Sequence, residues 1–159
     1  MDGFSGEDGE FTVRSVDRVG QAREYRCRKV ILATGFYDRP NLLNVPGEDL
    51  PKVIHYYREP HPYYDCDVAV VGGKNSAAIA ALELYWSGAR VTLIHRGAGM
   101  SEKVKYWIKP NIENRIKNGE VTGYFNSQIR SIEPEAIVVE TPEGEVRLKN
   151  DFVFAMVGY

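Results

Sequence analysis

Cysteine is scarce in this chain of 159 residues, which contains only Cys27 and Cys66. The two form neither a C-x-x-C pair nor a metal-ligand spacing, so the sequence predicts no internal redox disulfide and no metal site. The N-terminus, MDGFSGEDGE, is acidic and glycine-rich, which is the opposite of a signal peptide. Together these features indicate a reducing cytoplasm.

Long apolar runs and an excess of positive charge are also missing. No run approaches the roughly 18 residues of a membrane span, and the formal net charge of −2 gives no reason to expect a broad nucleic-acid surface. Hydrophobic residues make up 43% and charged residues 26%, an ordinary balance for a globular domain. We therefore expect neither a membrane nor a nucleic acid as partner.

The first third of the chain has little helical character. Residues 1–9 resemble a loose end, and the β-branched and aromatic residues of 10–16 and 24–34 predict strands that are joined by a turn near Gly20. The second strand ends in an apolar burst, VILATG, which predicts burial. Five of the eight prolines lie in residues 36–66, which we interpret as a connector.

The middle of the chain predicts a strand–helix–strand unit. DVAVV (67–71) is a continuous apolar run, typical of a strand covered on both faces. A helix is expected over 77–88 and a second strand over 90–94, connected by a right-handed crossover. The helical spacing predicts a buried stripe of Ile79, Leu82 and Trp86.

Helix and strand signals also fill the rest of the chain. Ser101 could cap a short helix over 101–107, with Trp107 packed in the core, and Pro110 suits the first turn of another helix. Five β-rich segments complete this part: VTGYF, QIRSI, AIVVET, EVRL and DFVFAMV. TPEGE between the third and the fourth predicts a hairpin turn.

The turn after DVAVV reads GGKNSA, residues 72–77. It matches G-x-G-x-x-A with Lys74 in place of the middle glycine, a pattern that lets the backbone approach a pyrophosphate at a helix N-terminus. Asn75 or Ser76 could cap that helix. Lys74 takes space near a phosphate, but it could also offset the phosphate charge from the rim. The alternative is an ordinary strand-to-helix turn without a ligand.

An acidic residue that would bind the ribose of NAD is missing at the end of the second strand, which carries His95 and Arg96. A guanidinium there suits a 2′-phosphate, and the imidazole could add a donor or stack on adenine. This predicts NADPH rather than NADH. The alternative is a solvated strand end, and for Lys103 and Lys105 a phosphate contact and a solvated position are equally open.

In combination, GGKNSA and VTLIHR resemble the NADPH-binding half of the thioredoxin-reductase-like flavoproteins. VILATGFYDRPNLLNVPGED (30–49) and DFVFAMVGY (151–159) extend the resemblance. GGKNSAAIAALELYWSGARVTLIHRG and KYWIKPNIENRIKNGE are similar to the bacillithiol disulfide reductase group. The resemblance implies an α/β fold, a Rossmann-like three-layer NADPH-binding domain with a parallel sheet and a β-meander. It also implies flanking β-rich pieces of a flavin domain, with boundaries at 1–54, 55–149 and 150–159.

The resemblance also implies roles for individual residues. NADPH would pass a hydride to FAD, and the flavin would reduce a small-molecule disulfide or a small redox protein. No catalytic residue is expected in this chain. The expected cofactor-binding residues lie at the pyrophosphate (Gly72, Gly73, Lys74, Asn75, Ser76, Ala77), the 2′-phosphate (His95, Arg96) and the flavin side (Thr34, Gly35).

The chain departs from the family pattern in two ways. HYYREPHPYYDCD (55–67) holds a single cysteine where thioredoxin reductases carry a C-x-x-C, so direct reduction of thioredoxin by that route is not expected. Its aromatic residues either cover the nicotinamide or contact the flavin, or they form a packed connector between domains. The chain also has no strand followed by G-x-G-x-x-G before residue 10, so we expect a fragment that binds NADPH, does not retain FAD and could self-associate.

Other functions stay open at this stage. A ferredoxin- or flavodoxin-NADP reductase or a flavin monooxygenase would share the NADPH turn and differ in what the flavin reduces. A non-catalytic nucleotide-binding or redox-sensing module is the alternative from another class.

Overall fold

The computed structural model describes residues 3–33, 35 and 39–159. The chain divides into two compact units, Met1–Phe36 and Tyr37–Tyr159. Thr34, which was predicted to lie on the flavin side, is outside the described residues. Residues 39–54 and 150–159 lie in the same unit as the predicted domain at 55–149.

The first unit contains an antiparallel sheet of three strands, β1 (Gly3–Glu7), β2 (Glu10–Val16) and β3 (Ala22–Cys27), in the order β1-β2-β3. The turn at Gly20, which has φ 83°, is confirmed. Residues 1–9 were predicted to be a loose end, and that prediction is wrong for residues 3–7, which pair with residues 10–14 of β2. The rings of Phe4 and Phe11 meet edge to face across this pairing, 6.2 Å apart.

The apolar segment after β3 differs from the prediction. Ile31 is 89% exposed and Leu32 59% exposed, and no strand is formed in residues 28–33. The prediction of a buried strand is wrong for these residues, because within the described part of the chain no neighbouring strand pairs with them. A strand needs such a neighbour to satisfy its backbone groups.

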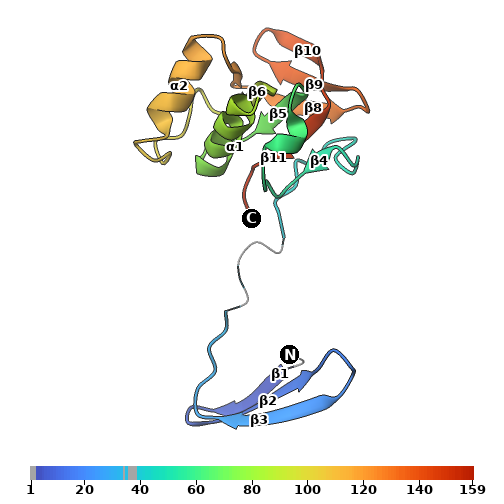
Figure 1. Ribbon diagram of the computed structural model, residues 1–159, viewed down its shortest axis with the longest axis vertical. Coiled ribbons are helices and arrows are strands. Elements are labelled where there is room, and N and C mark those ends of the chain that lie inside the picture. The colour runs from blue at the N-terminus through green and yellow to red at the C-terminus, as the bar shows by residue number, and fades with distance from the viewer. Residues whose placement is uncertain (1–2, 34, 36–38) are drawn as a thin grey trace. The chain divides into compact units, whose positions relative to one another are not determined.

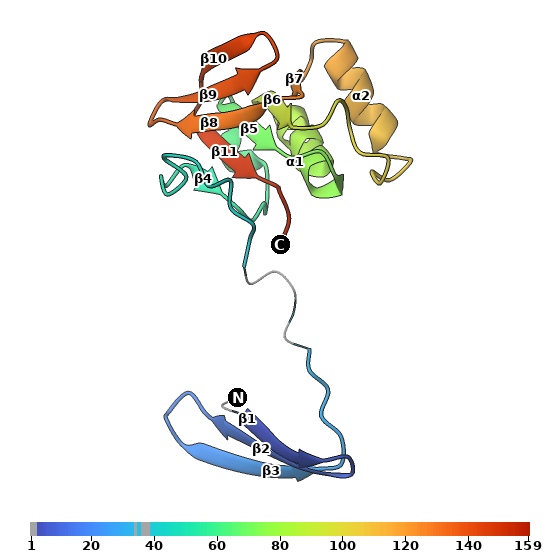
Figure 2. The same ribbon diagram turned by 180° about the vertical axis from the view of Figure 1, so that it is seen from behind.

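The second unit is a three-layer α/β structure, which confirms the predicted fold class. Its central sheet is parallel, with the strand order β4-β11-β5-β6-β7. Helices α1 and α2 lie on one face, and an antiparallel sheet of β8, β9 and β10 lies on the other (Figures 1 and 2). The elements are β4 (Val53–Ile54), a 3₁₀ helix (His61–Tyr63), β5 (Asp67–Val71), α1 (Asn75–Trp86), β6 (Arg90–His95), α2 (Lys109–Lys117), β7 (Thr122–Phe125), β8 (Gln128–Ile132), β9 (Ala136–Thr141), β10 (Gly144–Lys149) and β11 (Phe152–Ala155).

Alternation along β5 explains its apolar sequence. Val68 and Val70 join the core under the helices, whereas Ala69 and Val71 join the core under the antiparallel sheet. Side chains of a strand point to opposite faces in turn, so a strand covered on both sides must be apolar throughout. The burial that was predicted from DVAVV is confirmed.

The buried face of α1 consists mainly of alanines, with Leu82 and Leu84. These short side chains let the helix approach the sheet closely. Only Leu82 of the predicted stripe is buried, since Ile79 is half-buried and Trp86 is 57% exposed. Gly88, with φ 87°, follows the helix end as predicted.

Residues 101–107 form turns rather than the predicted short helix. The Ser101 hydroxyl accepts a hydrogen bond from the backbone N–H of Lys103 (3.2 Å), which closes a local turn that competes with helix formation. Trp107, predicted to lie in the core, is 59% exposed. The next helix, α2, forms as predicted, with Pro110 in its first turn.

A buried lysine connects three segments of this unit. The Lys52 ammonium donates to the backbone carbonyls of Glu133 (2.9 Å), Pro134 (3.2 Å) and Asn150 (2.7 Å). It thereby links the residue before β4 to the β8–β9 turn and to the connection between β10 and β11. Burial lowers the pKa of Lys52, so part of this stabilisation is offset by the cost of desolvating the charge.

We expect Lys52→Met to lower the free energy of unfolding by about 1–3 kcal/mol, because three carbonyls lose a charged donor. Urea unfolding at neutral pH measures the change. Lys117→Met is the matched control, because Lys117 is exposed on α2. Equal stability of the two variants would contradict the role given to Lys52.

No helix in the described part of the chain has the length and apolar character needed to cross a membrane.

Candidate nucleotide-binding site

The turn between β5 and α1 leaves no room for a side chain at Gly72. Its φ is 145°, and an added Cβ would lie 2.5 Å from the carbonyl oxygen of Met156 and 2.9 Å from the Cβ of Ala77. The Gly72 N–H donates to the carbonyl of Ile94 (3.0 Å). The turn is thus packed between the ends of β6 and β11 and the first turn of α1, which requires glycine.

The start of α1 has free donors. Its N-cap is Lys74, whose side chain makes no capping bond, and among the described residues no side chain accepts from the first turn. The predicted cap by Asn75 or Ser76 is therefore wrong. The reason is that the Asn75 amide is engaged elsewhere. Backbone N–H groups without partners at a helix N-terminus suit an anion.

The Asn75 amide holds the loop after β6 with both of its polar atoms. Its Nδ2 donates to the carbonyl of Lys103 (3.1 Å), and its Oδ1 accepts from the N–H of Lys105 (2.9 Å). The Ser101 N–H also donates to the Gly73 carbonyl (2.9 Å). The loop at 101–107 is therefore fixed beside the glycine turn.

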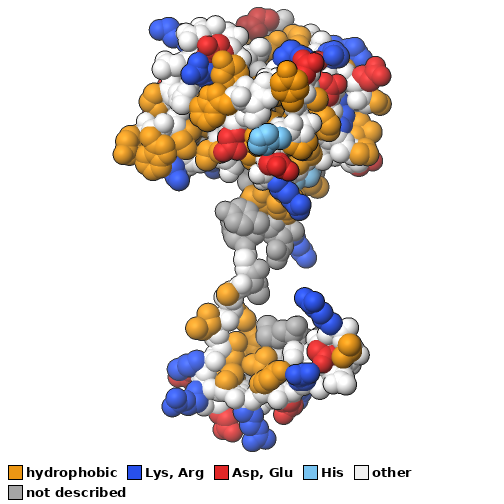
Figure 3. Space-filling view, viewed as in Figure 1, with side chains coloured by type: hydrophobic (Ala, Val, Ile, Leu, Met, Phe, Trp, Pro, Cys, Tyr) orange, Lys and Arg blue, Asp and Glu red, His pale blue; other side chains and the backbone are white. Residues whose placement is uncertain are grey.

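Exposed aromatic and basic side chains occupy that loop. Tyr106 is 82% exposed, and the ammonium of Lys105 lies 5.2 Å from the centre of the Trp107 ring. Figure 3 shows hydrophobic side chains at the surface in this region. Lys103 and Lys105 are both exposed, so the structure leaves a phosphate contact and a solvated position equally open.

His95 lies between two glycines at the end of β6. A Cβ on Gly73 would lie 2.3 Å from its Nε2, and one on Gly97 2.7 Å from it. Burial and the nearby Arg96 lower the pKa of His95. The imidazole is therefore mostly uncharged at neutral pH and can offer a phosphate only a neutral N–H.

Arg96 supplies the positive charge at this position. It is exposed and forms no ion pair with any described residue. It borders a cavity of about 380 Å³ between the end of β6 and the antiparallel sheet. The other residues of this hollow are Asn126, Ser127, Gln128, Glu140, Thr141 and Pro142, and we call it the Arg96 hollow.

Sequence reasoning missed the Arg96 hollow because most of its lining lies at least 30 positions beyond Arg96. The connection is made by the backbone, since Asn126 donates to the Gly97 carbonyl (2.9 Å) and Ser127 to the His95 carbonyl (3.1 Å). Asn126 adopts a left-handed conformation with φ 49°. Asn is one of the few residues that tolerate this turn, and that is the one sequence signal available.

Two further groups of residues were predicted to take part in binding, the flavin-side pair Thr34 and Gly35 and the aromatic residues of 55–67. Gly35 belongs to the first unit and has φ 83°, and its assignment to the flavin side stays a prediction, as does that of Thr34. Tyr57 and Tyr63 pack edge to face on Phe154, with ring centres 5.6 and 4.9 Å apart. These contacts favour the packed-connector interpretation of HYYREPHPYY for these two residues.

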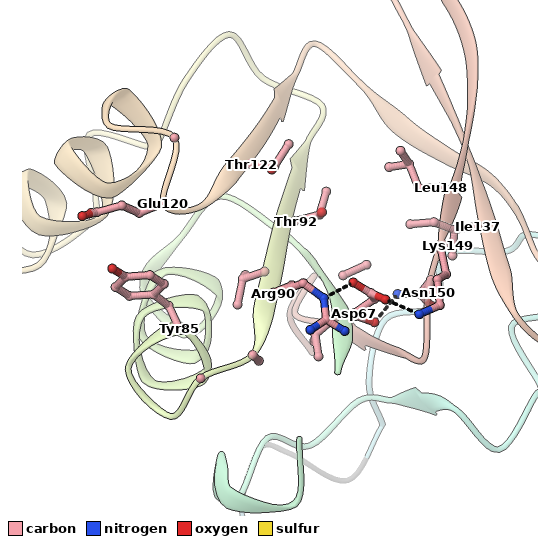
Figure 4. Close-up of a pocket in the computed structure, with 16 residues that line it drawn as sticks. Asp67, Tyr85, Arg90, Thr92, Glu120, Thr122, Ile137, Leu148, Lys149 and Asn150 are labelled. Carbon is pink, nitrogen blue, oxygen red and sulfur yellow. Dashed lines mark hydrogen bonds and ion pairs between the residues drawn. The ribbon is translucent and has the colours of Figure 1, made fainter. Parts of the chain in front are cut away.

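A larger cavity, of about 590 Å³, lies at the other end of the parallel strands, where β5, β6 and β7 begin (Figure 4). Its charges neutralise one another, since the Asp67 carboxylate accepts from Arg90 Nε (2.6 Å) and pairs with Lys149 Nζ (2.8 Å). The hydrogen bond from Arg90 lowers the pKa of Asp67. Because both cations are engaged, this cavity is less suited to a phosphate than the glycine turn is.

The described part of the chain offers no metal site, and the thiol of Cys66 is not activated. No group of three or more His, Cys, Asp or Glu side chains is close enough to hold a metal ion there. Both cysteines are free, and burial raises the pKa of Cys66. A raised pKa keeps the thiol protonated and less nucleophilic at neutral pH.

The chain is similar to known oxidoreductases in both sequence and structure. The family model described as "Pyridine nucleotide-disulphide oxidoreductase" matches residues 5–159. Bacilliredoxin reductase Bdr of Bacillus subtilis (strain 168) is 52% identical over 136 residues, which are 85% of this chain and 42% of that protein. The structure of bacillithiol disulfide reductase Bdr (YpdA) from Bacillus cereus superimposes with a TM-score of 0.87 at 44% identity. The match covers 98% of this chain and 48% of that one.

A relative with a different name is also similar. The ferredoxin–NADP reductase of Ignicoccus hospitalis is 31% identical over 142 residues, 86% of this chain and 45% of that protein. The chain therefore spans less than half the length of each of these three relatives.

Proposed function

Because this chain belongs to the pyridine nucleotide-disulphide oxidoreductase family, we propose that the turn between β5 and α1 is the NADPH-binding site of a flavoprotein reductase. The observation that carries the proposal is Gly72, where a side chain is excluded on two sides at the start of a helix without a side-chain cap. This geometry lets a pyrophosphate approach the free N–H groups of α1.

The choice of NADPH over NADH rests on Arg96. The exposed guanidinium stands at the end of β6, where an NAD-binding chain carries an acid, and a guanidinium can donate two hydrogen bonds to a 2′-phosphate. His95 lies uncharged between its two glycines. Its imidazole forms part of the surface of the site and offers one N–H donor. Asn75 acts indirectly, by holding the loop that carries Lys103 and Lys105.

The relatives support a chemistry for the whole protein. NADPH held at this turn would supply a hydride to the FAD of the whole protein, which would reduce an acceptor. The names of two relatives support the nature of that acceptor: bacilliredoxin reductase indicates a small redox protein, and bacillithiol disulfide reductase indicates a bacillithiol-type disulfide. The described residues of this chain contribute binding, orientation and the charge of Arg96, and none of them is assigned to the electron transfer itself.

A second candidate is a ferredoxin–NADP reductase. The 31% identity to the Ignicoccus protein favours it, and the nucleotide site would be the same. A flavin monooxygenase and a non-catalytic nucleotide-binding module share that site as well. The electron acceptor of the full-length protein separates these functions.

The location of the site is tested by NMR on the isotope-labelled chain. We expect NADPH to shift the backbone amide signals of Gly72, Gly73 and Ser76, because they line the proposed pyrophosphate position. Signals of Gly119 and Thr122, at the opposite cavity, should stay in place. Shifts that cluster at the opposite cavity would contradict the proposal.

A further inference from the structure

We propose that Glu140 and Gln128 recognise the base of the bound dinucleotide and make the Arg96 hollow selective for adenine. This inference rests on the proposed function, because it assumes that NADPH binds at the glycine turn. It adds two specificity-determining residues, which lie outside the glycine turn and outside β6.

The two side chains form a pair across neighbouring strands. Gln128 on β8 and Glu140 on β9 are directly opposite each other, and the Gln128 Nε2 donates to the Glu140 Oε2 (3.2 Å). Both are exposed and both line the hollow. The pair therefore presents polar atoms to a ligand instead of burying them.

The Gln128–Glu140 pair is held in a fixed position relative to Arg96. Ser127, the residue before Gln128, is only 3% exposed, and its N–H donates to the carbonyl of His95. Its hydroxyl donates to the Phe125 carbonyl (2.7 Å). We place the base of a nucleotide whose 2′-phosphate contacts Arg96 in the same hollow, because Arg96, Gln128 and Glu140 all line it.

The hydrogen-bonding capacity of the pair matches adenine. An ionised Glu140 has only acceptor oxygens, and Gln128 keeps its carbonyl oxygen and one amide hydrogen free when the other hydrogen is given to Glu140. Adenine offers the complementary pattern, an exocyclic amine donor beside ring nitrogen acceptors. A base with a keto oxygen at that position would place an acceptor against the carboxylate, which is unfavourable.

The test compares NADPH with its reduced hypoxanthine analogue, in which the amine is replaced by a keto oxygen. Calorimetric titration of the wild-type chain is expected to show NADPH binding about tenfold or more tightly, since hydrogen bonds to charged groups are strong. We expect Glu140→Gln and Gln128→Leu each to reduce this preference by at least about threefold. The preference for NADPH over NADH should stay unchanged in both variants.

Glu145→Gln is the matched control, because Glu145 lies opposite Glu140 on β10 and does not line the hollow. This variant should retain the wild-type preference for adenine. Equal binding of the two bases by the wild-type chain, or a preference that survives both substitutions, overturns the inference while leaving NADPH binding intact. A wild-type chain that binds no NADPH overturns both this inference and the proposed function.

Discussion

Gly72→Ala is expected to weaken NADPH binding by about a hundredfold or more. An alanine at φ 145° is strained by roughly 1–3 kcal/mol, and its Cβ would lie 2.5 Å from the Met156 carbonyl oxygen. The turn must shift away from β11 to relieve this contact. A displacement of about 1 Å in a positioning element can cost on the order of a hundredfold. Isothermal titration with NADPH measures the change.

A nearby glycine provides the control for this substitution. Gly99 lies in the loop after β6, and a Cβ added there meets no atom within 4 Å. We expect Gly99→Ala to bind NADPH like the wild-type chain. Thermal unfolding of Gly72→Ala separates a loss of the site from a loss of the fold. A folded Gly72→Ala variant with wild-type affinity would rule out the proposed pyrophosphate position.

Arg96→Ala is expected to lower the affinity for NADPH by about ten- to a hundredfold and to leave the affinity for NADH unchanged. Hydrogen bonds to a charged group contribute roughly 1.5–3 kcal/mol, and about 1.4 kcal/mol corresponds to tenfold. NADH has no 2′-phosphate, so it loses no partner. Parallel titrations with the two coenzymes give both affinities.

The control for charge alone is Arg130→Ala. Arg130 is exposed on β8, pairs with Glu145 (3.9 Å) and does not line the hollow. Arg130→Ala removes the same formal charge as Arg96→Ala, so any general electrostatic effect appears in both variants. If Arg96→Ala reduces NADPH and NADH binding equally, Arg96 is not the residue that distinguishes them.

The parallel core and its glycine turn could be predicted from sequence because each rests on a local requirement. Four consecutive apolar residues in β5, from Val68 to Val71, fit a strand covered on both faces, and Gly72 fits a turn that no other residue can adopt. The Gly88 position after α1 follows from the same local logic. Such features depend on neighbours in the chain, and sequence patterns record them directly.

The errors have a different physical origin. Trp107 and Trp86 are large and apolar, which favours burial, but both lie at the surface. Asn75 has the right chemistry for a helix cap, but a loop 28 to 30 residues further along takes both of its polar atoms. Tertiary contacts of this kind override local propensity, and nothing in a short sequence window records them.

The lining of the Arg96 hollow could not be predicted for the same reason. Gln128 and Glu140 come together only because β8 pairs with β9 in one particular register. That register depends on which faces of the strands are buried, and it brings the pair beside Arg96 through backbone bonds from Asn126 and Ser127. Sequence reasoning therefore found Arg96 but missed Gln128 and Glu140, which line the hollow together with it.

We propose that this chain binds a dinucleotide carrying a 2′-phosphate. The most direct test titrates the wild-type chain with NADPH and NADH in separate calorimetric experiments under the same buffer and salt conditions. We predict one NADPH per chain, bound about tenfold or more tightly than NADH. Equal affinities for the two coenzymes, or no binding of NADPH, would contradict it.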